Sequence, residues 1–295
     1  MKKNKTLFLS LVFFFQRILF AIKFCGKEQI VLNSSVWPEW FGLGIGKVNF
    51  GDDLNVPLIE HLTSTQVRLY STLLRKRGRE NLLAIGSIIE NFCNEDSVIW
   101  GSGAMFGNKP LLHKPKKVCS VRGPLTREYL TSQGIDCPEI YGDPALLFPM
   151  FYTPQIEKKY KLGIIPHYSD FNLPHIKDFR DFHPEILFIK LQNYVSWQDI
   201  INQICSCEYI VSSSLHGLIL SDAYNIPNVR ITCSDAIEGG DFKYKDYMMG
   251  GGREYQEPID CKTSINLDTI FDKLEGYTPI QFDAKLLLEV FPYKK

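Results

Sequence analysis

A serine-rich turn between an apolar strand and a helix is the segment best suited to chemistry. Residues 208–227 read EYIVSSSLHGLILSDAYNIP, and we expect the helix to begin near Leu215. Backbone N–H groups at a helix start bind anions, so Ser213, Ser214 and Leu215 are candidate binding positions. His216, in the first turn, can donate a hydrogen bond to a phosphate or transfer a proton near neutral pH. The alternative is a core histidine beside a serine-capped helix.

A second strand and helix carry an arginine at their turn. Residues 117–130 read KVCSVRGPLTREYL, which places Arg122 at the turn and Pro124 in the first helical turn. A guanidinium there offers a rigid fork to a carboxylate or phosphate. Residues 109–127 hold six Lys and Arg and no acid, which is also consistent with a solvated basic face.

Three glycine-containing turns add further candidates. Gly101, Ser102 and Gly103 follow an apolar strand, and their backbone N–H groups could cradle an anion. The loop 49–55, NFGDDLN, places Asn49, Asp52 and Asp53 before a helix expected to begin near Asn55, where capping is the ordinary role. Asp143 ends another strand, where it either fixes a turn or orients a site group. The candidate residues in these turns are Gly101, Ser102, Gly103, Asn49, Asp52, Asp53 and Asp143.

Short apolar runs alternate with helix-like segments, which predicts an α/β protein with parallel strands. The expected strands are 29–32, 82–85, 97–101, 117–121, 139–141, 161–165, 185–189, 209–212 and 228–231. In open parallel sheets, ligands bind at the carboxyl ends of the strands. The candidate residues fall at such ends.

The length of 295 residues suits two domains. We expect an N-terminal basic and apolar segment at 1–25, one Rossmann-like domain at 26–152, a second at 153–275, and a C-terminal helix and tail at 276–295. The helix, at 284–290, could pack on either domain.

Composition excludes several classes of protein. The chain has 33 Lys and Arg against 33 Asp and Glu and 45% hydrophobic residues, which excludes a disordered tail and argues against a nucleic-acid coat. The zero net charge averages unlike regions, since residues 68–79 hold five basic residues and no acid. The eight cysteines show no zinc-binding spacing, so we expect reduced thiols, a cytoplasmic location and no metal.

The first 24 residues combine Lys2, Lys3 and Lys5 with an apolar run from 7 to 24. Gln16, Arg17 and Lys23 interrupt the run, which disfavours a membrane span, and no cleavage site for a signal peptide is evident. Two interpretations remain. The segment either lies in a membrane interface as a basic amphipathic helix or packs on the body of the protein.

Six motifs together resemble the polysaccharide pyruvyl transferase family. They are NFGDDLN at 49–55, GSG at 101–103, SVRGPLTREYL at 120–130, GI followed by YGDPALLFP within 134–149, SSSLHGLILSDAYNIP at 212–227 and DFKYKDYMMGGGRE at 241–254. The resemblance covers about residues 45–255, in the order and spacing of the family.

The resemblance implies two domains arranged like those of GT-B glycosyltransferases. It also implies transfer of the pyruvyl group of phosphoenolpyruvate to two hydroxyls of a sugar, giving a cyclic ketal and phosphate, with no metal or cofactor. By family position His216 is the best candidate for the general acid. The attacking sugar hydroxyl also needs a base, and Asp52, Asp53 or Asp143 could serve. Arg122 and the start of the helix at 213–216 bind the donor. The expected acceptor is a lipid-linked saccharide or an oligosaccharide.

Ser214 departs from the family pattern, because many members carry an arginine there. Arg122, Lys243, Lys245 or Arg253 could compensate, or donor handling differs. Two other functions remain open. One is a GT-B-like glycosyltransferase that uses a nucleotide sugar, with Glu238 or Asp241 holding the ribose. The other is a non-catalytic glycan-binding protein.

Overall fold

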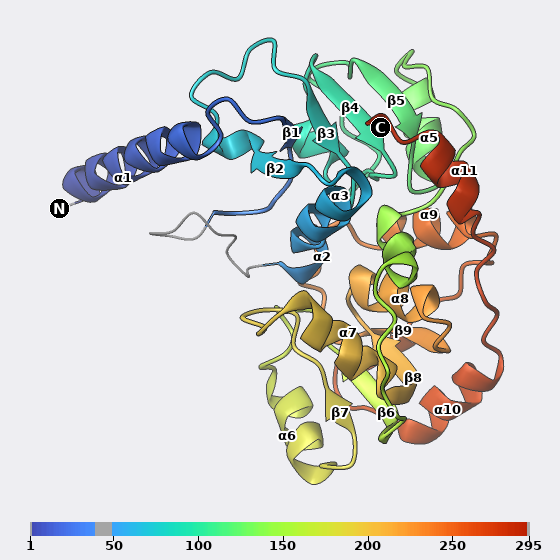
Figure 1. Cartoon of the computed structure of the whole chain (residues 1–295). Coiled ribbons are helices and arrows are strands. Elements are labelled where there is room, and N and C mark those ends of the chain that lie inside the picture. The colour runs from blue at the N-terminus through green and yellow to red at the C-terminus, as the bar shows by residue number, and fades with distance from the viewer. Residues whose placement is uncertain (1, 39–48, 294–295) are drawn as a thin grey trace.

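Two parallel five-stranded sheets form the framework of the protein, and each sheet with the segments between its strands is called the first or the second domain. The computed structural model describes residues 2–38 and 49–293 (Figure 1). The first sheet has the order β2-β1-β3-β4-β5 and the second the order β10-β9-β8-β6-β7. The strands are β1 (Gln29–Leu32), β2 (Gln66–Leu69), β3 (Asn81–Leu83), β4 (Ser97–Trp100), β5 (Lys117–Ser120), β6 (Tyr160–Ile165), β7 (Leu187–Phe188), β8 (Cys207–Ser212), β9 (Asn228–Thr232) and β10 (Ile259–Asp260).

The two sheets share one topology. Counted from the first strand of each, both orders read 2-1-3-4-5, and all pairings are parallel. This is a doubly wound, Rossmann-like order, in which the chain reverses direction across the sheet beside the first strand. The switch points therefore lie between β1 and β3 and between β6 and β8, and ligand sites are expected at their carboxyl ends.

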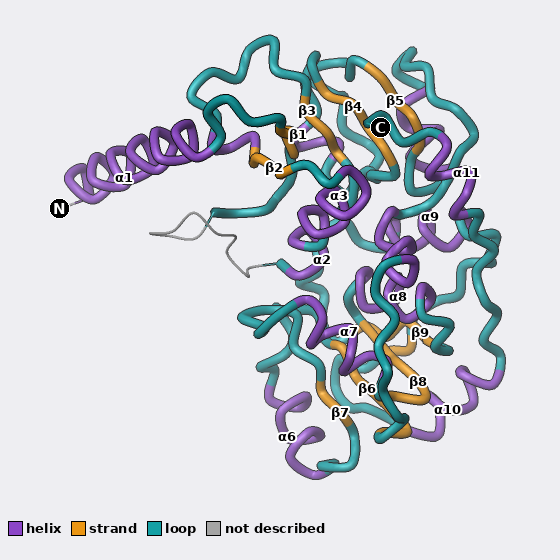
Figure 2. Tube along the Cα trace, in the orientation of Figure 1, coloured by secondary structure: helices purple, strands orange, loops and turns teal. Residues whose placement is uncertain are grey.

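Helices connect and cover the strands (Figure 2). They are α1 (Lys2–Lys23), α2 (Phe50–Asp53), α3 (Asn55–Thr63), α4 (Ile89–Phe92), α5 (Pro124–Thr131), α6 (Pro174–Phe182), α7 (Trp197–Cys205), α8 (Leu215–Ala223), α9 (Phe242–Gly250), α10 (Leu267–Glu275) and α11 (Ala284–Glu289), with 3-10 turns η1 (Tyr70–Thr72) and η2 (Pro144–Met150). Local sequence starts several of them. Ser196, Asn266 and Asp283 cap α7, α10 and α11 with side-chain oxygens, and Pro124 opens α5.

The helix expected near Leu215 is confirmed as α8, and the C-terminal helix is confirmed as α11. Trp100 Nε1 donates to the Leu287 carbonyl at 2.9 Å, which packs α11 against the first sheet. The expected strand at 139–141 is wrong, because the segment forms only a parallel bridge between Val121 and Tyr141. Pro138 and Pro144 flank it and lack the N–H donors of a longer ladder.

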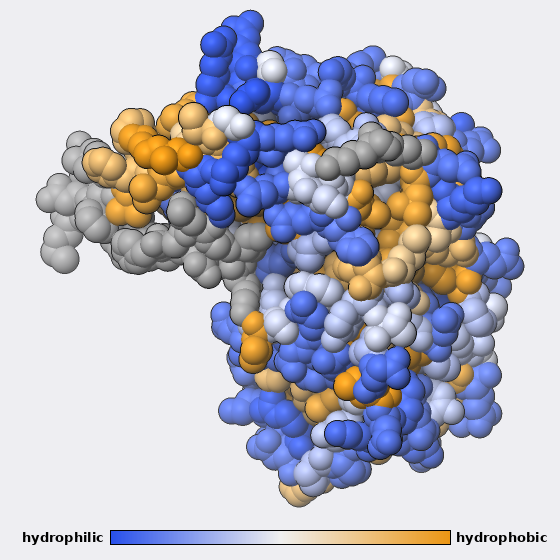
Figure 3. Space-filling model, viewed as in Figure 1, coloured by the Kyte–Doolittle hydropathy of each residue, from blue (hydrophilic) through white to orange (hydrophobic). Residues whose placement is uncertain are grey.

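Helix α1 projects from the first domain, away from the body of the molecule (Figure 1). Its visible face in Figure 3 gathers apolar residues. Within the described residues, no helix has the length and apolar character needed to cross a membrane.

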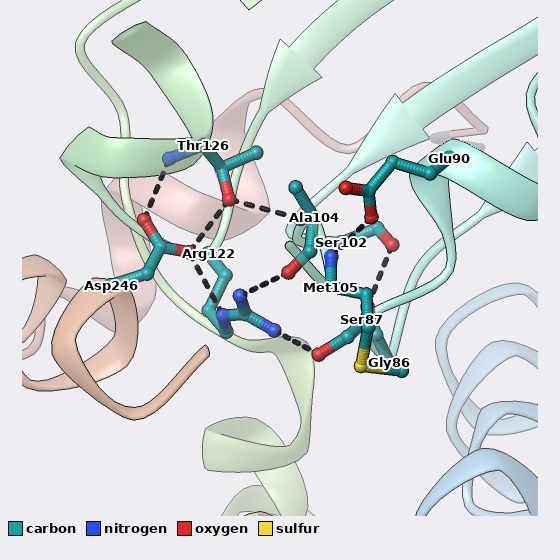
Figure 4. A network of polar contacts seen from close by, with 9 residues as sticks. All are labelled: Gly86, Ser87, Glu90, Ser102, Ala104, Met105, Arg122, Thr126 and Asp246. Atoms are coloured by element: carbon teal, nitrogen blue, oxygen red, sulfur yellow. Dashed lines mark hydrogen bonds and ion pairs between the residues drawn. The ribbon is translucent and has the colours of Figure 1, made fainter. Parts of the chain in front are cut away.

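A buried ion pair joins the two domains (Figure 4). Arg122, after β5, donates from Nε to Asp246 of α9 at 2.9 Å, and both side chains are fully buried. Asp246 also accepts hydrogen bonds from Thr126 N at 2.8 Å and Thr126 Oγ1 at 2.7 Å. The other two guanidinium nitrogens donate to Ser87 Oγ and, at 2.8 Å, to the Ala104 carbonyl. The pair therefore fixes α9 on the first domain.

Glycines allow this close approach. A Cβ at Gly103 would lie 2.2 Å from Arg122 Cζ, and one at Gly123 would lie 1.8 Å from the Asp246 carbonyl oxygen. A side chain at Gly123 would collide with α9, and one at Gly103 would displace the Arg122 guanidinium that holds α9.

Asp246→Ala should lower the free energy of unfolding by about 3–5 kcal/mol, because it leaves the Arg122 charge buried without its partner. Urea unfolding followed by circular dichroism measures this. Asp272→Ala, at an exposed position of α10, is the matched control and should change stability by about 0.5 kcal/mol or less. Equal effects of the two substitutions would contradict the role of the ion pair.

Candidate functional site

A polar cavity of about 340 Å³ lies between the two domains, at the carboxyl ends of the strands beside both switch points. Ser35 follows β1, Ser87 follows β3, His167 follows β6 and His216 follows β8. The full lining is Ser35, Asn49, Asp52, Gly86, Ser87, Ile88, Asn91, Phe92, Met105, His167, Tyr168, Ser169, Leu191, Ser214, Leu215, His216, Ala236, Glu238 and Lys243. The switch points of the two domains thus face one another across a single cavity.

His216 lies in the first turn of α8, with its ring against Gly51 of α2. A Cβ at Gly51 would lie 1.9 Å from His216 Nδ1, so only glycine allows this contact. Nε2 is buried and has no hydrogen-bond partner among the described residues. Burial, then the positive charges of Arg122 and Lys243, lower the pKa of His216 to about 3. The imidazole is therefore neutral, with one nitrogen available to a ligand.

Asp52 brings a carboxyl group of the first domain into the same cavity. It lies in α2 rather than in the expected loop, and Asn49 Nδ2 donates to it. A Cβ at Gly86, which has φ +120°, would lie 2.6 Å from Asp52 Oδ1. Burial, then Asp53 and Asp143, raise the pKa of Asp52 to about 7, while Lys243 opposes the shift. This carboxyl group can therefore exchange a proton near neutral pH.

Asn55 fixes the position of α2. Its Nδ2 donates to the Asp52 carbonyl and to the Ile85 carbonyl, both at 2.9 Å, and its Oδ1 accepts from Ile85 N at 2.8 Å. The fully buried amide ties the helix carrying Asp52 to the loop after β3. Asn55, the second asparagine of the 49–55 motif, therefore has a structural role.

Lys243 supplies the positive charge of the cavity. Among the described residues that line it, Lys243 is the sole lysine or arginine. Its Nζ donates to the Glu238 carbonyl at 2.9 Å. Burial, then Arg122 and Arg230, lower its pKa to about 8, so the ammonium form predominates at neutral pH.

The other three candidates proposed to compensate for Ser214 lie outside the cavity lining. The three guanidinium nitrogens of Arg122 donate within the protein, as described above. Arg253 pairs with Asp222 at 3.0 and 3.1 Å. Lys245 Nζ lies 4.7 Å from the centre of the Tyr255 ring. Of the four cations, Lys243 alone lines the cavity.

The predicted anion cradle at 101–103 also lies outside the cavity lining. The N–H of Gly101 donates to the Ser120 carbonyl and that of Gly103 to the Gly86 carbonyl, each at 3.0 Å. Ser102 Oγ donates to the same Gly86 carbonyl at 2.9 Å. These donors are already engaged, so the turn shapes the loop that carries Ser87 rather than offering N–H groups to an anion.

Two carboxylates and one serine from the predicted set lie behind the cavity. Asp143 is fully buried, accepts from Ala145 N at 2.9 Å, and has a pKa raised to about 7 by burial. Asp53 accepts a hydrogen bond from Tyr194 of the second domain at 2.8 Å. Ser213 Oγ accepts from His167 N at 2.8 Å. By contrast, Ser214 and Leu215 do line the cavity.

His167 and Ser169 are site residues that the sequence reasoning missed. His167 Nδ1 pairs with Ser169 Oγ at 2.8 Å, and burial, then Lys243, lower the His167 pKa to about 4. Their position just after the expected strand at 161–165 could have identified them. In the described part of the chain, no group of three or more His, Cys, Asp or Glu side chains is placed to hold a metal ion.

Comparison with known proteins identifies the family of the chain. A family model described as "Polysaccharide pyruvyl transferase" matches residues 49–235, which include Asp52, His167 and His216. The chain is 29% identical over 248 residues to the uncharacterized protein L143 of Acanthamoeba polyphaga mimivirus, covering 81% of this chain and 84% of that protein. It is also 29% identical over 221 residues to the succinoglycan biosynthesis protein ExoV of Rhizobium meliloti (strain 1021), covering 70% of this chain and 63% of that protein. Since the family match spans more than half of its length, the chain belongs to the polysaccharide pyruvyl transferase family.

Proposed function

We propose that this protein transfers the pyruvyl group of phosphoenolpyruvate to two hydroxyls of a sugar in a polysaccharide repeat unit. The products would be a cyclic ketal and phosphate. The observation that supports this most is one cavity, at two facing switch points, that holds His216 Nε2 without a partner and Asp52 with a pKa raised to about 7. The family and the succinoglycan biosynthesis relative support a polysaccharide acceptor. We also propose the GT-B-like arrangement, in which the two domains enclose the substrates.

The donor carries about three negative charges, and the cavity offers it Lys243 and the start of α8. First-turn N–H groups of a helix have no partner within the helix, so Leu215 and His216 can donate to the donor phosphate. The donor's negative charge favours the charged form of a neighbouring imidazole. Binding of phosphoenolpyruvate would therefore raise the pKa of His216 and prepare it as an acid.

Two groups, His216 as proton donor and Asp52 as proton acceptor, account for the bonds formed and broken in this reaction. His216 gives a proton to the methylene carbon, which becomes the methyl group and leaves an oxocarbenium-like centre at the adjacent carbon. Asp52 accepts the proton of the first attacking hydroxyl as its C–O bond forms. The C–O bond to phosphate then breaks, the second hydroxyl forms the second C–O bond, and its proton leaves with phosphate. Asp53 and Asp143, which lie behind Asp52, would tune its pKa rather than touch the sugar.

Phosphate release with phosphoenolpyruvate and candidate lipid-linked saccharides tests the function. The reaction in D2O should place one deuterium in the methyl group of the ketal, since one solvent-derived proton is added there. Absence of release with every acceptor, from a folded protein that does not bind phosphoenolpyruvate, would refute the proposal.

Binding measurements distinguish two alternative functions, a glycosyltransferase and a non-catalytic glycan-binding protein. Glu238 lines the cavity and could bind a ribose, whereas Asp241 pairs with Arg230 outside its lining. Stabilisation by nucleotide sugars but not by phosphoenolpyruvate would favour a glycosyltransferase. Tight donor binding without turnover would favour a non-catalytic glycan-binding protein.

His216→Ala should lower the rate of phosphate release by about 10²–10⁴-fold, because it removes the proton donor. The thermal unfolding temperature should stay close to that of the wild type. His113→Ala, at an exposed histidine outside the cavity lining, is the control and should keep full activity. Wild-type turnover in His216→Ala would rule out the assigned role.

Lys243→Met should raise the KM for phosphoenolpyruvate by about 10–100-fold, the loss expected for a charged hydrogen bond. Lys245→Met removes the same charge two residues along α9, outside the cavity lining, and should leave KM within about twofold. Initial rates over a range of donor concentration give both values.

Adding Ser214→Arg to Lys243→Met should recover part of the lost donor affinity, because it returns a cation to the cavity wall. An unchanged KM in Lys243→Met, with no effect of the added arginine, would show that the donor binds elsewhere.

The affinity for phosphoenolpyruvate should fall as the pH rises through about 8, where Lys243 loses its charge. The ammonium form, which attracts the anionic donor, is present below that pH and is lost above it. Lys243→Met should bind the donor more weakly and show no such fall, as measured by calorimetric titration at several pH values. Persistence of the fall in that variant would contradict its assignment to Lys243.

A further inference from the structure

Five cations without acidic partners gather at the base of α1. Residues 68–79 contain Arg68, Arg75, Lys76, Arg77 and Arg79, hereafter the basic cluster, and no Asp or Glu. None of the ion pairs among the described residues involves the basic cluster. All of its members except Arg68 are exposed.

The cluster forms a built pocket rather than a scattered surface charge. A cavity of about 580 Å³ is lined by the four arginines of the cluster together with Ala21 of α1 and Leu74. Arg68 is 6% exposed, and its Nη1 and Nη2 donate to Gln29 Oε1 at 3.3 Å and the Thr72 carbonyl at 3.4 Å. Its Nε is buried and has no hydrogen-bond partner in the described part of the chain. The hydrogen-bond partners of this buried guanidinium are neutral. A bound anion would therefore balance its charge.

Helix α1 presents an apolar face beside this pocket. Phe15, Leu19 and Ile22, spaced to lie on one face, are 62%, 53% and 68% exposed. Phe20 and Phe24, on the opposite face, are 4% and 3% exposed. The helix projects from the domain in Figure 1, and its coloured part, nearest the domain, shows apolar residues in Figure 3. Because Ala21 lines the pocket and Ile22 belongs to the apolar face, the two features adjoin.

We propose that α1 and the basic cluster dock on the surface of an anionic phospholipid bilayer. The apolar face would enter the boundary between head groups and acyl chains, as interfacial helices do. The arginines would bind lipid phosphates, whose oxygens match the guanidinium fork. A second copy of the chain is a poorer occupant, because a symmetric contact through this surface would bring two basic clusters together.

Docking would also place the polar cavity close to the bilayer, a consequence that rests on the proposed function. Trp37 lines an apolar pocket with Phe13 and Arg17 of α1, and Ser35 lines the polar cavity. Because Trp37 follows Ser35 by two residues, the Cα atoms of these residues lie at most about 7 Å apart. A lipid-linked acceptor in the bilayer would then lie near the cavity.

Vesicle flotation with the full chain tests docking independently of catalysis. The vesicles are phosphatidylcholine alone, or phosphatidylcholine with about three tenths phosphatidylglycerol. The wild type should float with the anionic vesicles and stay unbound with the neutral ones. Arg75→Ser/Arg77→Ser/Arg79→Ser should weaken anionic binding by about tenfold or more, and Leu19→Glu/Ile22→Glu should do the same.

Matched controls change the same charge or polarity elsewhere on the surface. They are Lys159→Ser/Lys177→Ser/Lys285→Ser and Leu112→Glu/Phe182→Glu, all at exposed positions, and both should bind like the wild type. Thermal unfolding of each variant checks that the fold is kept.

Equal binding to neutral and anionic vesicles, no binding to either, or equal losses in variants and controls would overturn the proposal. Stabilisation by inorganic phosphate that depends on the three arginines, without vesicle binding, would also overturn it and indicate a site for a free anion. Phosphate release on a water-soluble saccharide by a protein that fails to float would leave the proposed function standing while docking fails.

Discussion

The buried contact between Arg122 and Asp246 is the constraint on which the site depends. It joins the loop after β5 to α9, and both side chains are fully buried. Lys243 lies one helical turn before Asp246 on α9, and Ser87, held by Arg122, lines the same cavity. The ion pair therefore fixes the position of the Lys243 ammonium group relative to the cavity wall that the first domain contributes. Burying such a pair costs desolvation, which is offset here by five hydrogen bonds: one between the two side chains, two more to Asp246 and two more from Arg122.

The repeated 2-1-3-4-5 topology explains why one cavity serves both domains. Each sheet offers a switch point, and the two meet with Asp52 on one side and His216 on the other. Gly51 is the point of contact, because its missing side chain is the space that the imidazole fills. The proposed acid, His216, and the proposed base, Asp52, thus come from different domains, and a change in the relative position of the domains would alter the distance between them.

Much of this could be predicted from sequence, because apolar runs ending in Gly, Ser or Asp mark the carboxyl ends of buried strands. That reasoning found Ser214, Leu215 and His216, which line the cavity. Asn49 and Asp52 were found from the loop at 49–55, and Lys243 from the family resemblance, and these three line it as well. The reasoning from strand ends missed His167, although the same rule applies to the end of β6.

The roles of Arg122 and the glycine turn at 101–103 could not be judged from sequence. The local sequence around an arginine at a strand end is the same whether the side chain binds a ligand or a distant residue. The partner of Arg122, Asp246, lies more than a hundred residues away in the chain. Only the fold shows that the guanidinium nitrogens are engaged and that the N–H groups of Gly101 and Gly103 already have acceptors. Long-range pairing, rather than local pattern, decided these cases.

A structure of the protein with phosphoenolpyruvate bound tests the central claim most directly. The account predicts the donor phosphate within hydrogen-bond distance of Lys243 Nζ and the start of α8, and the methylene carbon about 3–3.5 Å from His216 Nε2. A donor bound away from His216, or held by Arg122 after the Asp246 pair has opened, would contradict it.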